Sequence, residues 1–186
     1  MDVLSGLTLA APAGVNAYIP LLAVALAQRI GWLHLDAPYD VLGAWWVIAI
    51  IAALLIIEVI ADKVPAADHA NDVIQTVVRP AAGGLLAVSA SGQGTVSPVV
   101  LLVAGVLIAG GVHAVKASAR PVVNVSTAGA GAPIVSTLED IGAVIVTVLA
   151  LLVPVIAAVV IVLAVVFAVV LLRRWRRRHR AADGRA

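Results

Sequence analysis

The chain has 186 residues, of which 63% are hydrophobic and only 12% are charged, and it contains no cysteine. Soluble domains carry roughly 25% charged residues, and a soluble fold of this length cannot hide so much apolar surface, because a short chain still exposes a large share of its atoms. The composition therefore excludes an ordinary soluble domain and predicts an all-α membrane protein. The missing cysteines exclude a disulfide framework, a thiolate metal site and a thiol nucleophile.

The net charge of +2 conceals a split between the tail and the rest of the chain. Residues 173–186 contain seven arginines and one aspartate, whereas residues 1–172 contain five basic and nine acidic side chains. A short Arg cluster directly after an apolar run is typical of a cytoplasmic membrane flank. We therefore expect a single transmembrane domain over 1–172 and a basic cytoplasmic tail over 173–186, and we expect no binding to nucleic acid.

Five apolar stretches approach the length of about 20 residues that a membrane-spanning helix needs. The sequence thus predicts about five transmembrane helices. With the tail in the cytoplasm, alternation places the N-terminus and the loops 62–72 and 116–135 on the opposite face, although six crossings or a re-entrant first stretch would change this count. The stretches are Val3–Ala27, Ala44–Ala61, Val73–Ala90, Pro98–Val115 and Ile141–Leu172.

The first stretch is interrupted by Pro12, Gly14 and Pro20. Proline removes a backbone donor and crowds the preceding turn, and glycine adds conformational freedom. Broken backbone at membrane depth is tolerated only where protein or water satisfies its polar groups. Two half-helices around a break, a re-entrant hairpin and a simple proline kink are therefore all compatible with this stretch.

The second stretch opens with Trp45-Trp46 and predicts a clean span with an interfacial aromatic pair. The third contains Gly83-Gly84, and the part before it, 68–78, is alternatively an interfacial segment. Small residues at 105 and 109–111 of the fourth stretch predict close helix contact.

The fifth stretch is too long for a simple span, because its 32 residues would make about 48 Å of helix. Residues 136–139, Ser-Thr-Leu-Glu, form a capping-box pattern that would begin the helix near Ser136. Since no polar turn residues divide the stretch, we expect one long helix kinked near Pro154.

Charged residues at helical spacing lie within or beside the apolar stretches. Glu58 and Asp62 are one i,i+4 step apart and share a helix face, and His113, Lys116 and Arg120 form a basic stripe at i, i+3 and i+7. A charged group at the centre of a bilayer costs about 2.5–3.5 kcal/mol on insertion scales, so such groups usually pair or line a pathway. We expect the acidic and basic ends to meet and form a site for an ion, a proton or an anionic headgroup.

Four further residues join these candidates for substrate or ion binding: Asn16 in the first break, Arg79 beside Pro80, and Glu139-Asp140 at the entrance to the fifth stretch. The alternative interpretation is that all these charges are structural ion pairs, or long side chains near helix ends whose charged heads reach water.

A metal site is the third interpretation. Asp68 and Asp72, with His69 and Asn71 between them, offer hard oxygen ligands that suit Mg²⁺. We expect magnesium only if the protein is an enzyme, and no cofactor otherwise. No phosphate-binding loop is present, because the glycines at 92 and 94 are not followed by a P-loop lysine.

Two short segments of similar sequence are compatible with an inverted repeat. His69-Ala70 followed by Arg79-Pro80 resembles His113-Ala114 followed by Arg120-Pro121, and Asn124 would then correspond to Asn16. Small transporters are often built from inverted repeats with broken helices at the binding site.

Several of these motifs, taken in order, carry a family resemblance. They are Gly14-Val15-Asn16-Ala17-Tyr18-Ile19-Pro20, Glu58, Asp62-Lys63-Val64-Pro65, Asp68-His69, Asn71-Asp72, Arg79-Pro80, His113, Lys116, and Ser136 with Glu139-Asp140. The chain resembles, over nearly its whole length, the small bacterial membrane proteins grouped as domain of unknown function 4126. The resemblance implies a multi-pass inner-membrane protein and no established chemistry.

The sequence favours a small transporter or channel-like protein for an ion or small solute. Because an 18.9 kDa chain offers few helices to enclose a pathway, we expect a homo-oligomer in the lipid bilayer. The alternatives are a metal-dependent membrane enzyme acting on lipid phosphates and a non-catalytic subunit of a larger membrane complex.

Overall fold

The protein is all-helical over the residues described by the structure, a computed structural model that covers 2–63, 65–92, 96–127 and 130–183. Within this range, the side chains of 65–70, 72, 124, 126, 168 and 171–183 are not described. The described residues contain no strand, which confirms the predicted all-α class. The elements are α1 Val3–Val15, α2 Tyr18–Arg29, the 3-10 helix η1 Tyr39–Gly43, α3 Trp45–Ala61, α4 Pro65–Ser89, α5 Pro98–Ser126, α6 Ala132–Leu152 and α7 Pro154–Asp183.

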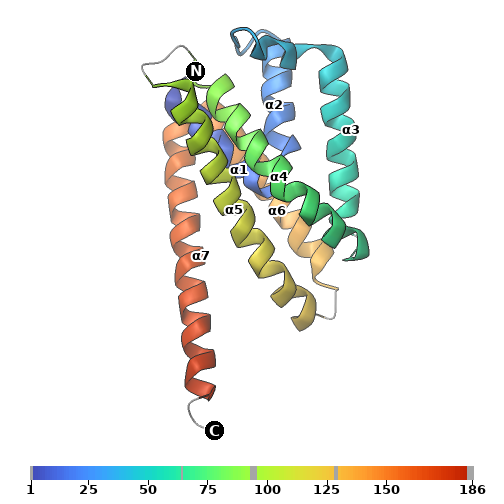
Figure 1. Cartoon of the computed structure of the whole chain (residues 1–186), viewed down its shortest axis with the longest axis vertical. Coiled ribbons are helices and arrows are strands. Elements are labelled where there is room, and N and C mark those ends of the chain that lie inside the picture. Colours follow the sequence, from blue (N-terminus) through green and yellow to red (C-terminus); the bar gives the residue numbers. More distant parts are fainter. Residues whose placement is uncertain (1, 64, 93–95, 128–129, 184–186) are drawn as a thin grey trace.

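The first apolar stretch is two short helices, α1 and α2, that form a hairpin. The backbone of Asn16 is extended, with φ −146° and ψ 116°, and it ends α1. Figure 1 shows α1 running inward from the N-terminus and α2 returning to the same end of the molecule. Helices of 13 and 12 residues are each about 20 Å long or slightly less, so the hairpin tip lies part-way along the bundle. The expected break is therefore present.

Local sequence explains where these two helices begin. Asp2 caps α1, because its carboxylate accepts hydrogen bonds from the amide and the hydroxyl of Ser5, and these bonds hold the pKa of Asp2 below its ordinary value. Pro20 lies in the first turn of α2, where its missing N–H leaves no internal hydrogen bond unmade.

The five longer helices, α3 to α7, alternate in direction along the bundle (Figure 1). One end carries the N-terminus and the connections α2–α3, α4–α5 and α6–α7; the other carries the connections α3–α4 and α5–α6 and the C-terminus. The expectation that residues 62–72 and 116–135 lie opposite the C-terminal tail is therefore wrong. The expectation failed because the fifth stretch was counted as one helix, whereas it forms two. The additional helix moves each earlier connection to the opposite end of the bundle.

The fifth stretch reverses direction at Val153. That residue separates α6 from α7 with φ −144° and ψ 76°, and Pro154 is the first residue of α7. A single long helix kinked near Pro154 is thus contradicted. Proline suits a helix start as well as a kink, so its presence does not distinguish the two. The capping-box prediction is also wrong, because α6 begins at Ala132 and Ser136 is buried in its interior.

Two other helices are longer than the apolar runs that predicted them. The α4 helix begins at Pro65, so residues 68–78 continue into the third stretch as one helix. The α5 helix continues through Arg120 and Pro121 to Ser126. Lys116 and Arg120 lie beyond the predicted end of the fourth span at Val115, but they are on the same helix as His113, as their spacing predicted.

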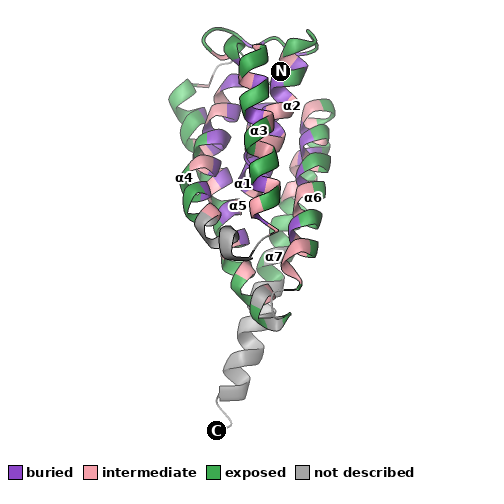
Figure 2. Cartoon of the chain, turned by 90° about the vertical axis from the view of Figure 1, so that its right-hand side faces the viewer, coloured by how far each residue is buried: buried purple, intermediate pink, exposed green. Residues whose placement is uncertain are grey.

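The closest helix contact joins α4 and α5 through small residues. A Cβ built on Gly105 would collide with the carbonyl oxygen of Gly83, and one built on Gly83 would collide with the Cβ of Ala109. The predicted packing role is thus confirmed for Gly105 and Ala109. It is wrong for Gly111, whose Cβ position meets no atom within 4 Å. Figure 2 shows the buried residues gathered on the helix faces that point toward one another.

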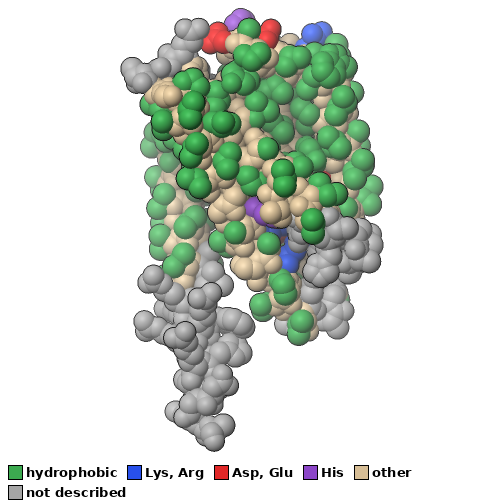
Figure 3. All heavy atoms as spheres, viewed as in Figure 1, with side chains coloured by type: hydrophobic (Ala, Val, Ile, Leu, Met, Phe, Trp, Pro, Cys, Tyr) green, Lys and Arg blue, Asp and Glu red, His purple; other side chains and the backbone are tan. Residues whose placement is uncertain are grey.

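The outer surface of the bundle is strongly apolar. Figure 3 shows hydrophobic side chains over most of one face, with acidic and basic groups at the end that carries the α2–α3 connection. Two segments, Pro98–Val123 and Ala132–Leu152, are long and apolar enough to cross a membrane by length and composition, and only 22% of the most apolar part of each is buried in the protein. The apolar parts of α1, α2, α3, α4 and α7 are shorter.

Candidate functional site

Two carboxylates at the end of α3 are the centre of a buried charge network. Glu58 lies in the last turn of the helix and Asp62 is its C-cap residue. Their i,i+4 spacing places both on one face, which points into the bundle, because the two residues are only 1% and 2% exposed.

Arg79 of α4 pairs with both carboxylates and is itself fully buried. Its Nη2 donates to Glu58 Oε1 at 2.8 Å and lies 3.9 Å from Asp62 Oδ2. Its Nη1 lies 2.9 Å from Nδ1 of His113, whose Nε2 is 3.2 Å from the hydroxyl of Thr76. Arg79 therefore links α3 to α5.

The basic stripe of α5 contacts the acidic end of α3, as the sequence predicted. Lys116 Nζ donates to Asp62 Oδ2 at 3.2 Å, and Arg120 Nη2 donates to the same oxygen at 2.9 Å. Both cations also reach Glu139 Oε2 of α6, at 3.0 Å and 3.6 Å. Asn71 of α4 donates to the other oxygen of Asp62.

The tip of the α1–α2 hairpin is hydrogen-bonded to this network. Lys116 Nζ donates to the backbone carbonyl of Val15 at 3.0 Å. Asn16 Nδ2 donates to Asp140 Oδ1 at 3.0 Å, while Asn16 Oδ1 accepts from the amides of Tyr18 and Ile19 and so acts as the N-cap of α2. The break in the first stretch is thereby fixed to α5 and α6.

The formal charges of the network nearly balance. Three cations face the carboxylates of Glu58, Asp62 and Glu139, and Asp140 is held apart by its bond to Asn16. Charges removed from water need such pairing, because the desolvation penalty is several kcal/mol per ion. Asp62 is the most heavily compensated group, with all three cations within 4 Å.

Several deeply buried polar atoms around Arg79 have no hydrogen-bond partner among the described residues. They include Glu58 Oε2, Gln75 Oε1 and Arg79 Nε. Gln75 is one helical turn before Arg79 on α4. An unsatisfied buried polar atom costs about 1–3 kcal/mol. Two of the three atoms are acceptors, which suits a proton or a cation.

The structure thus brings together all nine residues predicted to bind a substrate or ion: Asn16, Glu58, Asp62, Arg79, His113, Lys116, Arg120, Glu139 and Asp140. The predicted metal ligands, Asp68 and Asp72, lie outside the residues whose side chains are described. Among those that are, no group of three His, Asp or Glu side chains could hold a metal ion.

Sequence reasoning found the neutral Asn16 but missed Gln75 and Thr76 of α4. Gln75 and Thr76 precede Arg79 by four and three residues, a spacing that places them on its helix face. That spacing is the signal that could have found them. The carbonyl of Val15 carries no sequence signal, since any residue supplies one.

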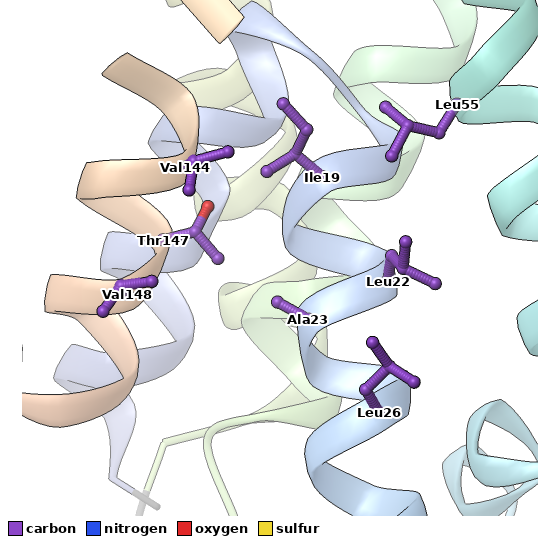
Figure 4. A pocket seen from close by; sticks show the side chains of 8 residues that line it. All are labelled: Ile19, Leu22, Ala23, Leu26, Leu55, Val144, Thr147 and Val148. Atoms are coloured by element: carbon purple, nitrogen blue, oxygen red, sulfur yellow. The ribbon is translucent and has the colours of Figure 1, made fainter. Parts of the chain in front are cut away.

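Two apolar cavities lie beside the network. The smaller, of about 230 Å³, separates α2 and α3 from α6, and Figure 4 shows Ile19, Leu22 and Leu55 across from Thr147 and Val148. The hydroxyl of Thr147 has no hydrogen-bond partner in the described chain. The larger, of about 660 Å³, lies between α1, α5, α6 and α7, and Glu139 is the single charged residue among the described side chains that line it.

The family model described as Domain of unknown function (DUF4126) matches residues 3–174. The chain belongs to this family. The match covers every helix that contributes to the charge network, which confirms the resemblance carried by the motifs. Comparisons with curated proteins and with solved structures give no match.

Proposed function

We propose that this DUF4126 protein is a multi-pass membrane protein in which α3 to α7 cross the bilayer and α1–α2 is a re-entrant hairpin. The apolar outer surface and the two long apolar helices support this placement. Lys63, Lys116 and Arg120 belong to the end of the bundle from which the C-terminus leaves. By the positive-inside tendency that end is cytoplasmic, in the inner membrane of a bacterium.

Within this membrane, we propose that the charge network binds and moves an ion or small solute, with a proton or small cation at Glu58. One observation carries the proposal: Glu58 is 1% exposed, one of its oxygens is paired with Arg79 and the other has no partner in the described chain. An intramembrane charge is expensive and usually marks a pathway. The half-depth hairpin above it resembles the broken helices that line transporter binding sites.

The geometry supplies a switch for such a step. A cation or proton at Glu58 Oε2 weakens the attraction between Glu58 and Arg79, and Arg79 has a second carboxylate within reach, Asp62 at 3.9 Å. A shift of Arg79 toward Asp62 competes with Lys116 for the same oxygen. Because Lys116 also holds the Val15 carbonyl, occupancy at Glu58 is coupled to the hairpin tip. A ligand shifts such an equilibrium only by its differential affinity for the two arrangements.

The experiment is a flux assay on purified protein reconstituted into liposomes, with proton, Na⁺ and K⁺ gradients tested separately. We expect flux of at least one cation with the wild-type protein and its loss in Glu58→Gln, which keeps the hydrogen-bond acceptor to Arg79 and removes the charge. The matched control is Lys63→Gln, because Lys63 follows α3 and its Nζ bonds only to the carbonyl of Val59 in the described structure. Flux that is equal in wild type and Glu58→Gln would contradict the proposal.

The same preparation distinguishes the other two functions. A magnesium-dependent enzyme acting on lipid phosphates would release product from the liposomes and lose activity in Asp72→Asn. A non-catalytic subunit would show no flux, and its Glu58 and Lys116 variants would fail to purify with a larger complex.

A further inference from the structure

The larger cavity is a side groove between α7 and the rest of the bundle. Its volume of about 660 Å³ is within the range of about 300–1,000 Å³ that is typical of ligand sites. Figure 1 shows α7 diverging from α5 toward the C-terminal end of the bundle. Apart from Glu139, the described residues that line the groove are aliphatic or glycine.

Two glycines widen this groove without serving helix contact. A Cβ on Gly111 of α5 or on Gly142 of α6 would meet no atom within 4 Å. Elsewhere in the same bundle glycines are packed against backbone, as Gly83 and Gly105 are. Glycine in a helix interior is about 1 kcal/mol less favourable than alanine. Packing within the described structure offers nothing in return at these two positions, so the space they leave open requires another explanation.

The groove has one polar end. Glu139 is bound by Lys116 and contacted by Arg120, and the Arg-rich segment begins at residue 173, four residues after Val169 along α7. Four helical residues correspond to about 6 Å of rise. A long apolar groove that is followed, about one turn further along α7, by an Arg-rich segment matches an amphipathic, anionic molecule.

We propose that the groove binds one acyl chain of an anionic phospholipid, with the headgroup at the Arg-rich end. The inference rests on the membrane placement in the proposed function, but not on transport. The bilayer itself supplies acyl chains to an apolar groove that opens sideways, and the cytoplasmic leaflet supplies anionic headgroups that basic segments attract. A second copy fits less well, because a two-fold dimer in a membrane would bring two tails of seven arginines each to the same side.

The test is native mass spectrometry of the protein released from nanodiscs of equal parts phosphatidylglycerol and phosphatidylcholine. We expect the wild-type chain to retain one phosphatidylglycerol. Gly142→Leu and Gly111→Leu place a side chain in the groove and should each lower the retained fraction about tenfold, equivalent to about 1.4 kcal/mol. Gly110→Ala is the matched control, since its Cβ would make only an ordinary 3.6 Å contact with Pro80.

Replacing Arg173, Arg174 and Arg176 by Gln tests the headgroup separately. We expect this variant to lose the preference for phosphatidylglycerol while an acyl chain still binds. Equal retention in wild type and both leucine variants overturns the lipid site, and equal retention of the two lipids by wild type overturns the anionic headgroup. Conversion of a dimer to a monomer by the leucine variants would assign the groove to a second copy. The Glu58→Gln variant should still retain phosphatidylglycerol. A failure of the transport proposal can therefore be distinguished from a failure of the lipid site.

Discussion

Arg79 and Glu58 form an ion pair of 2.8 Å in which both side chains are almost completely removed from solvent. The pair connects α3 with α4, and through His113 it extends to α5. Since Asp62 is 3.9 Å from the same guanidinium nitrogen, Arg79 is the only described cation that contacts both α3 carboxylates. It is the residue on which the stability of the network and the proposed switch both depend.

Loss of Arg79 should destabilise the fold strongly. Removing one partner of a buried pair costs about 3–5 kcal/mol, because the other charge stays buried without compensation. We expect Arg79→Met to lower the free energy of unfolding in detergent by that amount, and the double variant Arg79→Met/Glu58→Met to recover most of it. A double variant no more stable than Arg79→Met would show that the pair is not the source of the loss.

Two glycines on α5 should respond in opposite ways to the same substitution. A Cβ at position 105 would collide with the rigid backbone of Gly83, whereas one at position 111 enters open space. Overpacking typically costs about 1–3 kcal/mol, so Gly105→Ala should destabilise the protein by this much. Gly111→Ala should instead be neutral or gain up to about 1 kcal/mol from helix propensity. Thermal unfolding of both variants in one detergent is the measurement, and equal shifts would contradict the packing described for α4 and α5.

Substituted cysteines test the arrangement of the helix connections. The chain has no native cysteine, so single cysteines at Lys63 and Ala130 can be labelled without background. Both should react from the side that carries the C-terminus, and a cysteine at Asp36 should react from the other side. In intact cells, an impermeant maleimide should therefore label only position 36. Labelling of positions 63 or 130 from outside would contradict the proposed five crossings with a re-entrant hairpin.

The charged part of the site was predictable from the sequence because helical spacing determines which residues share a face. Glu58 with Asp62, and His113 with Lys116 and Arg120, are each fixed by i,i+3 and i,i+4 relations. An intramembrane charge also needs a partner, so the meeting of the two groups follows. Gln75 is uncharged and needs a partner less strongly than an ion does, so only its spacing from Arg79 on α4 could have indicated it.

The number of helices was less predictable, because a turn without polar residues cannot be recognised from the hydropathy of the sequence. Val153-Pro154 reverses the chain inside an apolar run, and the sequence cannot distinguish this from a kink. The ends of α4 and α5 lie outside the apolar runs, so hydropathy underestimated both helices. The predicted fourth span ended at Val115, whereas α5 continues to Ser126, so the whole basic stripe lies on one helix and Lys116 and Arg120 contact Asp62.

The side chains of Asn16 and Asp140 should tolerate being exchanged with each other, because the hydrogen bond between them can then form in the opposite direction. Asn16→Asp keeps the N-cap of α2 but loses the donor to Asp140 and places two carboxylates together, so we expect it to destabilise the protein by at least the roughly 1 kcal/mol of a lost hydrogen bond.

Combining Asn16→Asp with Asp140→Asn should reverse this loss. The amide at position 140 can then donate to the carboxylate at position 16, which still caps α2. The double variant should therefore be about 1 kcal/mol more stable than Asn16→Asp alone, as measured by unfolding in detergent. Asn16→Ala serves as the control, because it loses the cap as well and should not be rescued by Asp140→Asn. If the double variant is no more stable than Asn16→Asp, then Asn16 serves α2 alone and the hairpin tip is not anchored through α6.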